Sequence, residues 1–361
     1  MAELLLHSLA ELRELILPCL DLIGATTVVE VGGEDGTFTR ELAAWARARG
    51  GKVWCVDPAP SPDLLALGEA EPGVTLVQER SLEALAHLPP ADAYLIDGDH
   101  NHYTVLRELQ AITAAAGGGQ GEGDGEDDVV GPLVVLHDVA WPWGERDLYY
   151  APGDLPAEAV HPHTYDHGVT LGSSGVVAGG FRSEGRFAAA LEAGGPANGV
   201  RTAVDDFLRD HEELRLAVIP CIFGLGVVYP ASAPWAEAVA RFLGPYDANP
   251  VLARLEHNRL ALYLKVLELH DDLKAVRGHV EDLALRVRDV EVENRALWAR
   301  VGELEAREVS ARRVREEVAT LSRSRALAVA EMVSRLWWRS RDAAGGVSRE
   351  RLRALLAETD G

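Results

Sequence analysis

The fold of this chain is decided by the stretch Thr26-Thr27-Val28-Val29-Glu30-Val31-Gly32-Gly33-Glu34-Asp35-Gly36-Thr37. Its run of β-branched residues is typical of a buried strand, and the glycines that follow allow the chain to turn sharply. Apolar residues at helical spacing then run from Phe38 to Ala48. A strand, a glycine-rich turn and a helix form the first unit of an open α/β sheet, and such sheets bind ligands at this kind of turn.

The same alternation continues along the chain. Further short apolar runs predict four strands: Lys52 to Val56, Val74 to Val77, Ala93 to Ile96 and Pro132 to Leu136. A helical pattern covers Tyr103 to Ala115, between the last two of these strands. We therefore expect an α/β fold with a Rossmann-like, doubly wound sheet.

Two flanking features complete the predicted first domain. An amphipathic helix is expected within residues 1–23, ahead of a domain spanning residues 24–245. Two neighbouring apolar runs, Leu214 to Pro220 and Gly226 to Pro230, predict a closing hairpin whose last strand is antiparallel.

Composition limits the classes of function. The 361 residues carry a formal charge of -22, which argues against a general nucleic-acid binder because phosphate contacts need a positive surface. The cysteines Cys19, Cys55 and Cys221 are far apart in apolar surroundings, which predicts buried thiols in a reducing cytoplasm. Neither a secretory signal nor a membrane span is expected.

Two segments interrupt the α/β pattern. Residues 117–131 are rich in glycine and acid and have no hydrophobic period, which predicts a flexible acidic loop. Residues 140–200 are long, irregular and aromatic. We expect this stretch to form a lid over the ligand edge, and the alternative is a packed surface excursion.

The pattern changes again over residues 250–308, where apolar residues follow a heptad repeat. Valine dominates the a positions, leucine is the commonest d residue and Asn294 occupies one a position; this pattern favours a parallel two-stranded coiled coil and hence a homodimer. The alternative is a helix that packs on its own domain. The seam comprises Leu255, Leu262, Val266, Leu269, Leu273, Val276, Val280, Leu283, Val287, Val290, Leu297, Val301 and Leu304.

We expect residues 309–361 to form a basic helical tail, which contains the paired tryptophans Trp337 and Trp338. Such a helix can lie on an anionic membrane surface, giving a peripheral contact, or dock on a partner or on its own dimer mate. The sequence leaves these three alternatives open.

The predicted cofactor site lies at the first strand ends. Gly32, Gly33 and Gly36 lack the G-x-G-x-x-G spacing of a dinucleotide cradle. Glu30 suits a ligand with an amino group or positive charge. Two further residues extend this site: Asp57, which ends the second strand, is placed to accept hydrogen bonds from a ribose diol, and Ser81, after the third strand, is a candidate neighbour of an adenine.

These residues resemble the class I S-adenosylmethionine-dependent methyltransferases, whose first motif is an acid-x-glycine turn and whose second is an acid that ends strand two. The resemblance covers about residues 24–230, including the closing hairpin. It implies S-adenosyl-L-methionine as cofactor. Glu34 departs from the pattern, because it stands where many members have the middle glycine.

The predicted chemical site lies at the next two strand ends. Asp97 and His100 follow the fourth strand, and His137 and Asp138 follow the fifth. Because both strands end at the same edge of the sheet, two carboxylates with a third donor nearby can hold a divalent cation such as Mg²⁺. A metal there lowers the pKa of a substrate hydroxyl, and a histidine takes the proton. For the neighbouring Asp99, the alternative to a role in this site is to cap the following helix.

These motifs are similar to the metal-dependent O-methyltransferases of the macrocin and catechol types. The resemblance implies that Asp97 and Asp138 are metal ligands and that His100 is the general base. His137 stands where relatives often have another acid, and Val139 also departs from the catechol pattern. It further implies a small-molecule or glycan substrate: the hydroxyl of a sugar or glycosylated natural product.

Two other classes of function compete with this prediction. One is a non-catalytic coiled-coil scaffold with a degenerate methyltransferase-like domain, which Glu34 and the long tail favour. The other is an NAD-dependent oxidoreductase, which the missing dinucleotide fingerprint disfavours. The joint presence of Asp57, Asp97, His100 and Asp138 favours the enzyme over the scaffold.

Overall fold

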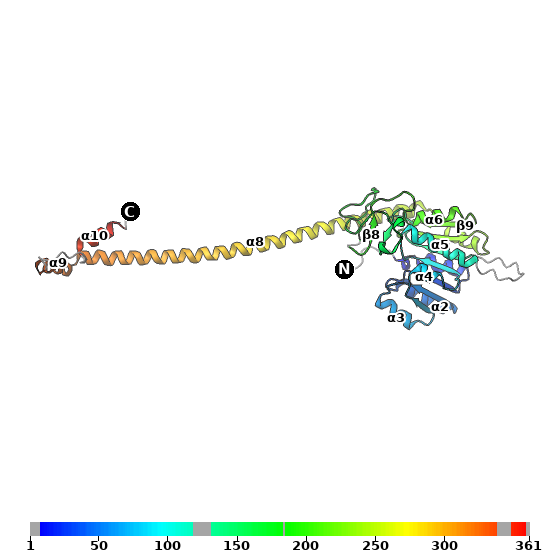
Figure 1. Cartoon of the computed structure of the whole chain (residues 1–361), viewed down its shortest axis with the longest axis horizontal. Coiled ribbons are helices and arrows are strands. Elements are labelled where there is room, and N and C mark those ends of the chain that lie inside the picture. Colours follow the sequence, from blue (N-terminus) through cyan, green and yellow to red (C-terminus); the bar gives the residue numbers. More distant parts are fainter. Residues whose placement is uncertain (1–7, 118–130, 183–184, 338–347, 359–361) are drawn as a thin grey trace. The chain divides into compact units, whose positions relative to one another are not determined.

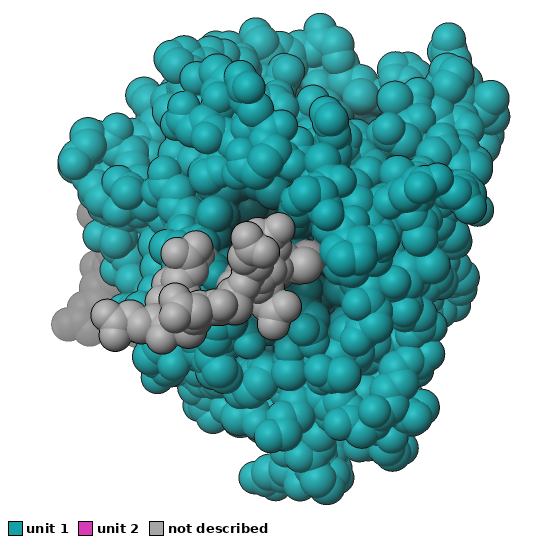
Figure 2. All heavy atoms as spheres, turned by 90° about the vertical axis from the view of Figure 1, so that its right-hand side faces the viewer, with its two compact units in different colours: residues 1–273 teal, residues 274–361 magenta. Residues whose placement is uncertain are grey.

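The computed structural model describes residues 8–117, 131–182, 185–337 and 348–358 (Figure 1). The chain divides into two compact units, residues 1–273, which Figure 2 shows in teal, and residues 274–361. The predicted acidic loop at 117–131 falls almost wholly on residues outside these ranges.

Within the described residues, the first unit contains a seven-stranded sheet in the order β3-β2-β1-β4-β5-β10-β9. The first five strands pair in parallel. Only β10 runs antiparallel to both of its neighbours, as the closing hairpin predicted. The strands are β1 Thr27–Val31, β2 Lys52–Val56, β3 Val74–Val77, β4 Ala93–Ile96, β5 Leu133–Leu136, β9 Leu214–Ile219 and β10 Leu225–Pro230.

Helices cover both faces of this sheet. One face carries α1 Arg13–Leu22, preceded by the 3₁₀ turn η1 Leu9–Leu12, together with α2 Thr37–Arg49, α3 Pro62–Ala70 and α7 Ala236–Leu243. The other face carries α4 Ser81–Leu85, α5 His102–Gly117 and α6 Val200–Arg209. Alternate strand residues point to opposite faces, so Val28 and Cys55 belong to the first core and Val29 and Val56 to the second. The Rossmann-like prediction is confirmed.

The segment between β5 and α6 forms a small subdomain. Its second sheet has the order β6-β8-β7, with β6 Leu148–Tyr149, β7 His163–Thr164 and β8 Ala188–Ala190, and it also contains η2 Pro152–Asp154 and η3 Ala157–Ala159. Two buried side chains hold it together. Arg146 donates to the carbonyl oxygens of Ala190 and Ser174. Asp147 accepts from the backbone N–H of His102 and Gly199 and from the Tyr149 hydroxyl.

Helix α8, Pro250–Arg323, begins in the first unit and ends in the second. All thirteen residues of the predicted seam are at least 41% exposed within the chain. Because α8 covers the whole predicted range 250–308, the helix is confirmed. Its pairing with a second copy stays a prediction.

The second unit continues with α9, Arg325–Trp337, and α10, Arg349–Glu358. Arg349, at the start of α10, donates to the Ser324 carbonyl and, through its backbone N–H, to Glu331. Trp338, half of the predicted tryptophan pair, lies outside the described residues. No helix in the described ranges is both long and apolar enough to cross a membrane.

Candidate active site

The glycine turn after β1 packs tightly against the neighbouring strand ends. A Cβ on Gly32 would lie 2.3 Å from the Asp97 carbonyl oxygen, and one on Gly33 would lie 2.5 Å from Cys55 Sγ. Glu34 adopts a φ of 48°, the left-handed conformation that a glycine takes most easily. The turn is therefore formed in spite of the missing middle glycine.

Asp57 closes this turn. Its Oδ2 accepts from the backbone N–H of Gly33 at 3.1 Å and of Glu34 at 3.0 Å, and its Oδ1 accepts from Ala59 at 2.8 Å. A carboxylate offers about four acceptor positions, so these bonds leave capacity for a ribose hydroxyl. The same side chain can shape the turn and contact a cofactor.

Of the other two predicted cofactor residues, Glu30 is buried and Ser81 is half-buried. Glu30 is 2% exposed, and its Oε2 accepts from Thr39 Oγ1 at 2.6 Å. Burial raises the pKa of Glu30 to about 7, partly offset by the Thr39 hydrogen bond. Ser81 begins α4 and lies beside Glu108 of α5. Burial raises the pKa of Glu108 to about 8, partly offset by the Ser81 hydroxyl.

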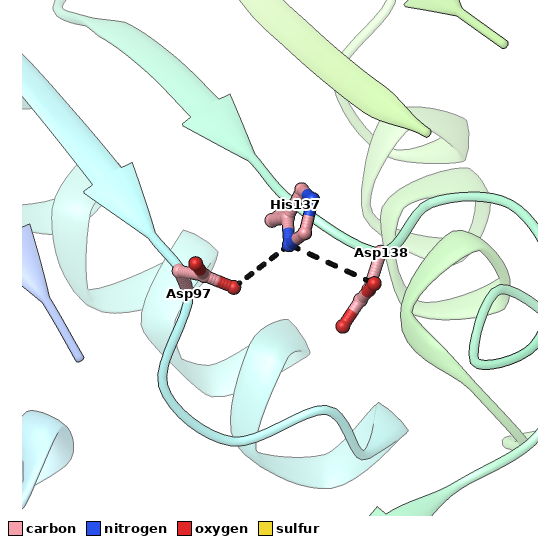
Figure 3. A group of neighbouring side chains, drawn as sticks. All are labelled: Asp97, His137 and Asp138. Atoms are coloured by element: carbon pink, nitrogen blue, oxygen red, sulfur yellow. Dashed lines mark hydrogen bonds and ion pairs between the residues drawn. The ribbon is translucent and has the colours of Figure 1, made fainter. Parts of the chain in front are cut away.

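Three predicted metal-ligating side chains converge at the ends of β4 and β5. Figure 3 shows Asp97, His137 and Asp138 pointing toward a common centre. One donor atom from each lies within 4.8 Å of the others. His137 Nδ1 is 3.0 Å from Asp97 Oδ1 and 3.6 Å from Asp138 Oδ1. The structure thus brings together the three residues that the sequence proposed.

His137 carries a proton on each ring nitrogen in this arrangement. Its Nε2 lies 2.8 Å from the Ile222 carbonyl oxygen, which only accepts, while Nδ1 faces the carboxylate of Asp97. Burial lowers the pKa of His137, but Asp97 and Asp138 outweigh this effect and raise the pKa to about 9. The positive imidazolium thereby balances the two carboxylates.

This donor set fits a divalent cation. A cation at the centre would replace the Nδ1 proton of His137 and would be held by that nitrogen and by Asp97 and Asp138. Nε2 would keep its proton and its bond to the Ile222 carbonyl, which is the usual second partner of a metal-binding histidine.

His100 lies on the opposite side of Asp138. Its Nδ1 is 3.1 Å from Asp138 Oδ2, and its Nε2 is 4.0 Å from Asp97 Oδ1. With Nδ1–H donating to Asp138, the lone pair of the neutral ring is on Nε2, at the carboxylate cluster. This is the orientation of a general base held by a carboxylate.

Sequence reasoning missed two neighbours of His100. Tyr150, in the 140–200 segment, is half-exposed, and its ring centroid lies 6.3 Å from that of His100. The sequence signal for Tyr150 was its place in the aromatic segment.

Asn101, not Asp99, caps α5, because its Oδ1 accepts from the Thr104 N–H at 2.9 Å. The adjacent His102 N–H is bound instead by Asp147.

Comparison with known proteins assigns part of the chain. Residues 29–116, from β1 to α5, match a family model described as a methyltransferase domain. No curated protein matched the sequence. The Rossmann-like fold and this match together indicate a methyltransferase domain over these residues.

Several solved structures are similar at low identity. An S-adenosylhomocysteine-bound methyltransferase from Podospora anserina is 12% identical with a TM-score of 0.34, over 60% of this chain and 76% of that one. A Burkholderia thailandensis 1,6-didemethyltoxoflavin-N1-methyltransferase is 14% identical with a TM-score of 0.34, over 62% and 78%.

Proposed function

We propose that the chain is an S-adenosylmethionine-dependent O-methyltransferase, assisted by a divalent cation, that acts on the hydroxyl of a sugar or glycosylated small molecule. The observation that carries the proposal is the contact between the two sites. Gly32 of the cofactor turn packs on the Asp97 carbonyl, and Asp97 belongs to the carboxylate–histidine cluster. A methyl donor on the turn would lie beside an acceptor at the cluster.

His100 would serve as the general base. An acceptor hydroxyl beside its Nε2 would give up its proton to that nitrogen, and Asp138 would stabilise the resulting imidazolium through Nδ1. The acceptor oxygen would form a bond to the methyl carbon as the carbon–sulfur bond breaks. S-adenosylmethionine supplies the methyl group as a sulfonium, which leaves as a neutral thioether.

Asp97, Asp138 and His137 would hold the cation. When bound, it supplies positive charge that lowers the pKa of the acceptor hydroxyl. An imidazole nitrogen in the shell favours a transition metal over Mg²⁺, which prefers oxygen alone, and the two carboxylates suit Mn²⁺ among the transition metals. We therefore propose Mn²⁺ ahead of the Mg²⁺ that the sequence suggested.

The test is methyl transfer from labelled S-adenosylmethionine to a panel of sugar and glycoside hydroxyls. We expect transfer that chelation abolishes and that Mn²⁺ restores more fully than Mg²⁺. Transfer that is unaffected by chelation would remove the metal from the proposal. A folded protein that binds the cofactor but methylates none of the panel would overturn the substrate class.

We also propose that α8 pairs with a second copy of the chain as a parallel coiled coil. The seam side chains, from Val266 at 41% to Leu262 at 69% exposed, form a row at heptad spacing. The buried α8 contacts with the first unit, Glu256 and Leu260, and the half-buried Tyr263 occupy other positions of the helix. The thirteen seam side chains are therefore left exposed by the packing of α8 on its own domain.

A further inference from the structure

The turn between β9 and β10 has a strained backbone. Ile222 and Phe223 have φ values of 51° and 62°, and Gly224 follows with 92°. Left-handed φ is disfavoured for residues with a side chain, most of all for a β-branched one. Such a conformation persists only where surrounding contacts hold it, and it is often part of a functional site.

This turn is bound to the end of β5, beside the carboxylate–histidine cluster. The Ile222 carbonyl accepts from His137 Nε2 at 2.8 Å. The Phe223 carbonyl accepts from the Ala140 N–H at 2.8 Å, and the Gly224 carbonyl accepts from the Val139 N–H at 3.3 Å. The conformation of the turn therefore determines where the His137 ring points.

Glu256 of α8 holds the turn from the other side. It is 8% exposed, and its Oε1 accepts from the Phe223 N–H at 3.0 Å. Arg259 donates to both carboxylate oxygens at 2.7 Å, and its guanidinium lies 5.3 Å from the centre of the Phe223 ring. Burial raises the pKa of Glu256, but Arg259 and the backbone N–H outweigh it and lower the pKa, so the group is a carboxylate.

We propose that Glu256 is a positioning residue for the metal site: it holds the Ile222–Phe223 turn in the conformation whose carbonyl orients His137. This inference rests on the proposed metal site. It gives the first turns of α8 a task in the site itself, separate from the heptad seam. Glu256 contacts neither substrate nor metal and acts through the turn.

Three variants separate this role from ordinary helix packing. Glu256→Ala removes the acceptor for the Phe223 N–H. Like Glu256→Ala, Glu256→Gln loses the charge beside Arg259. Unlike it, Glu256→Gln keeps a side-chain oxygen that can accept from the Phe223 N–H. Glu268→Ala removes a carboxylate on the same helix, in the same unit, whose partner is Lys265 at 2.8 Å and whose side chain is 60% exposed.

The measurement is Mn²⁺ binding by the full-length, metal-free protein, followed by electron paramagnetic resonance of the free ion. Loss of an outer-shell partner typically weakens metal affinity by about 10–100-fold, so we expect about a tenfold loss in Glu256→Ala. Glu256→Gln and Glu268→Ala should stay within about threefold of the wild type. Wild-type affinity in Glu256→Ala, or an equal loss in Glu256→Gln, would overturn the proposal.

A second readout needs no metal. The Nε2 proton of His137, bonded to the Ile222 carbonyl, should give a nuclear magnetic resonance signal that His137→Asn removes and Glu256→Ala shifts or broadens. If the wild type binds no Mn²⁺, the metal part of the proposed function fails, and this signal alone decides the role of Glu256. An unchanged signal in Glu256→Ala refutes it. Should Glu256→Ala not fold, Glu256→Asp, whose side chain is one methylene shorter and which we expect to lose the bond to the Phe223 N–H, replaces it.

Discussion

His100 Nδ1 lies 3.1 Å from Asp138 Oδ2, while Asp138 Oδ1 lies 3.6 Å from His137 Nδ1. One carboxylate thus faces two histidines with different tasks. One of its oxygens orients the proposed base, and the other belongs to the group of donors for a cation. The backbone of Asp138 has a φ of 60°, so this arrangement is built on a conformation that L-residues seldom adopt.

Replacement of His100 tests the proposed base. General-base catalysis contributes about 10²–10⁴-fold to rate, so His100→Gln should lower kcat by that factor. The affinity for S-adenosylhomocysteine should not change, because His100 is not part of the glycine turn. A steady-state assay paired with calorimetry measures both quantities. Unchanged kcat would assign the proton to another group or to solvent.

The pH dependence of metal binding tests the protonated state of His137. Its pKa of about 9 means that a cation must displace a proton at neutral pH. Mn²⁺ affinity should therefore rise by about tenfold per pH unit up to about pH 9 and then level off. His137→Asn should remove this dependence. A flat profile in the wild type would mean that His137 is neutral or is not a ligand.

Burial of Glu108 should make the stability of the folded chain depend on pH. Its pKa is about 8 in the folded chain against an ordinary 4.5, so folding favours the protonated acid. The stability it contributes is complete below pH 4.5 and is lost as pH rises to about 8. At pH 9, Glu108→Gln should therefore be more stable than the wild type and unfold at a higher urea concentration. The difference in the free energy of unfolding should be a few kcal/mol at most, that is, about 1–5 kcal/mol. The exposed Glu83, replaced in the same way, is the control; equal curves for both variants would refute the assignment.

The sequence predicted the sheet well because its signals are local. All five parallel strands and the closing hairpin lie within one or two residues of the predicted runs, since buried strands read as continuous apolar stretches. The two-residue strands β6 and β7 are too short to show any period, so the order within residues 140–200 was not predictable. The start of α3 was signalled by Ser61, which caps it, and by Pro62, and was overlooked.

The site was predictable only in part. Asp97, His100, His137 and Asp138 follow strand ends that meet at one edge, so topology alone brought them together. The role of Glu256 could not be predicted from the sequence, because residues from 250 onward follow a heptad pattern. Its burial depends on a contact with Phe223, 33 residues earlier in the chain. Glu30 and Asp57 satisfy neighbouring groups of their own fold as well, which no sequence pattern reveals.

The coiled coil has a matched pair of variants. Leu283 occupies a predicted d position and is 44% exposed, whereas Leu285 is 59% exposed and lies at the outer f position of the same heptad. Leu283→Lys should weaken the dimer, because a charge at the seam cannot be buried there, while Leu285→Lys should not. Light scattering of the wild type should give twice the chain mass of 39.0 kDa. A monomeric wild type, or a dimer indifferent to Leu283→Lys, contradicts the pairing.

Calorimetric titration of S-adenosylhomocysteine into the wild type, Asp57→Ala and Asp63→Ala tests whether the glycine turn binds a methyl donor. Asp57 closes the glycine turn, whereas Asp63 is exposed in the first turn of α3. We predict micromolar affinity for the wild type and Asp63→Ala, and a loss of at least about tenfold, 1.4 kcal/mol, for Asp57→Ala. No binding by the folded wild type, or equal binding by all three proteins, would contradict the assignment of this turn as a methyl-donor site.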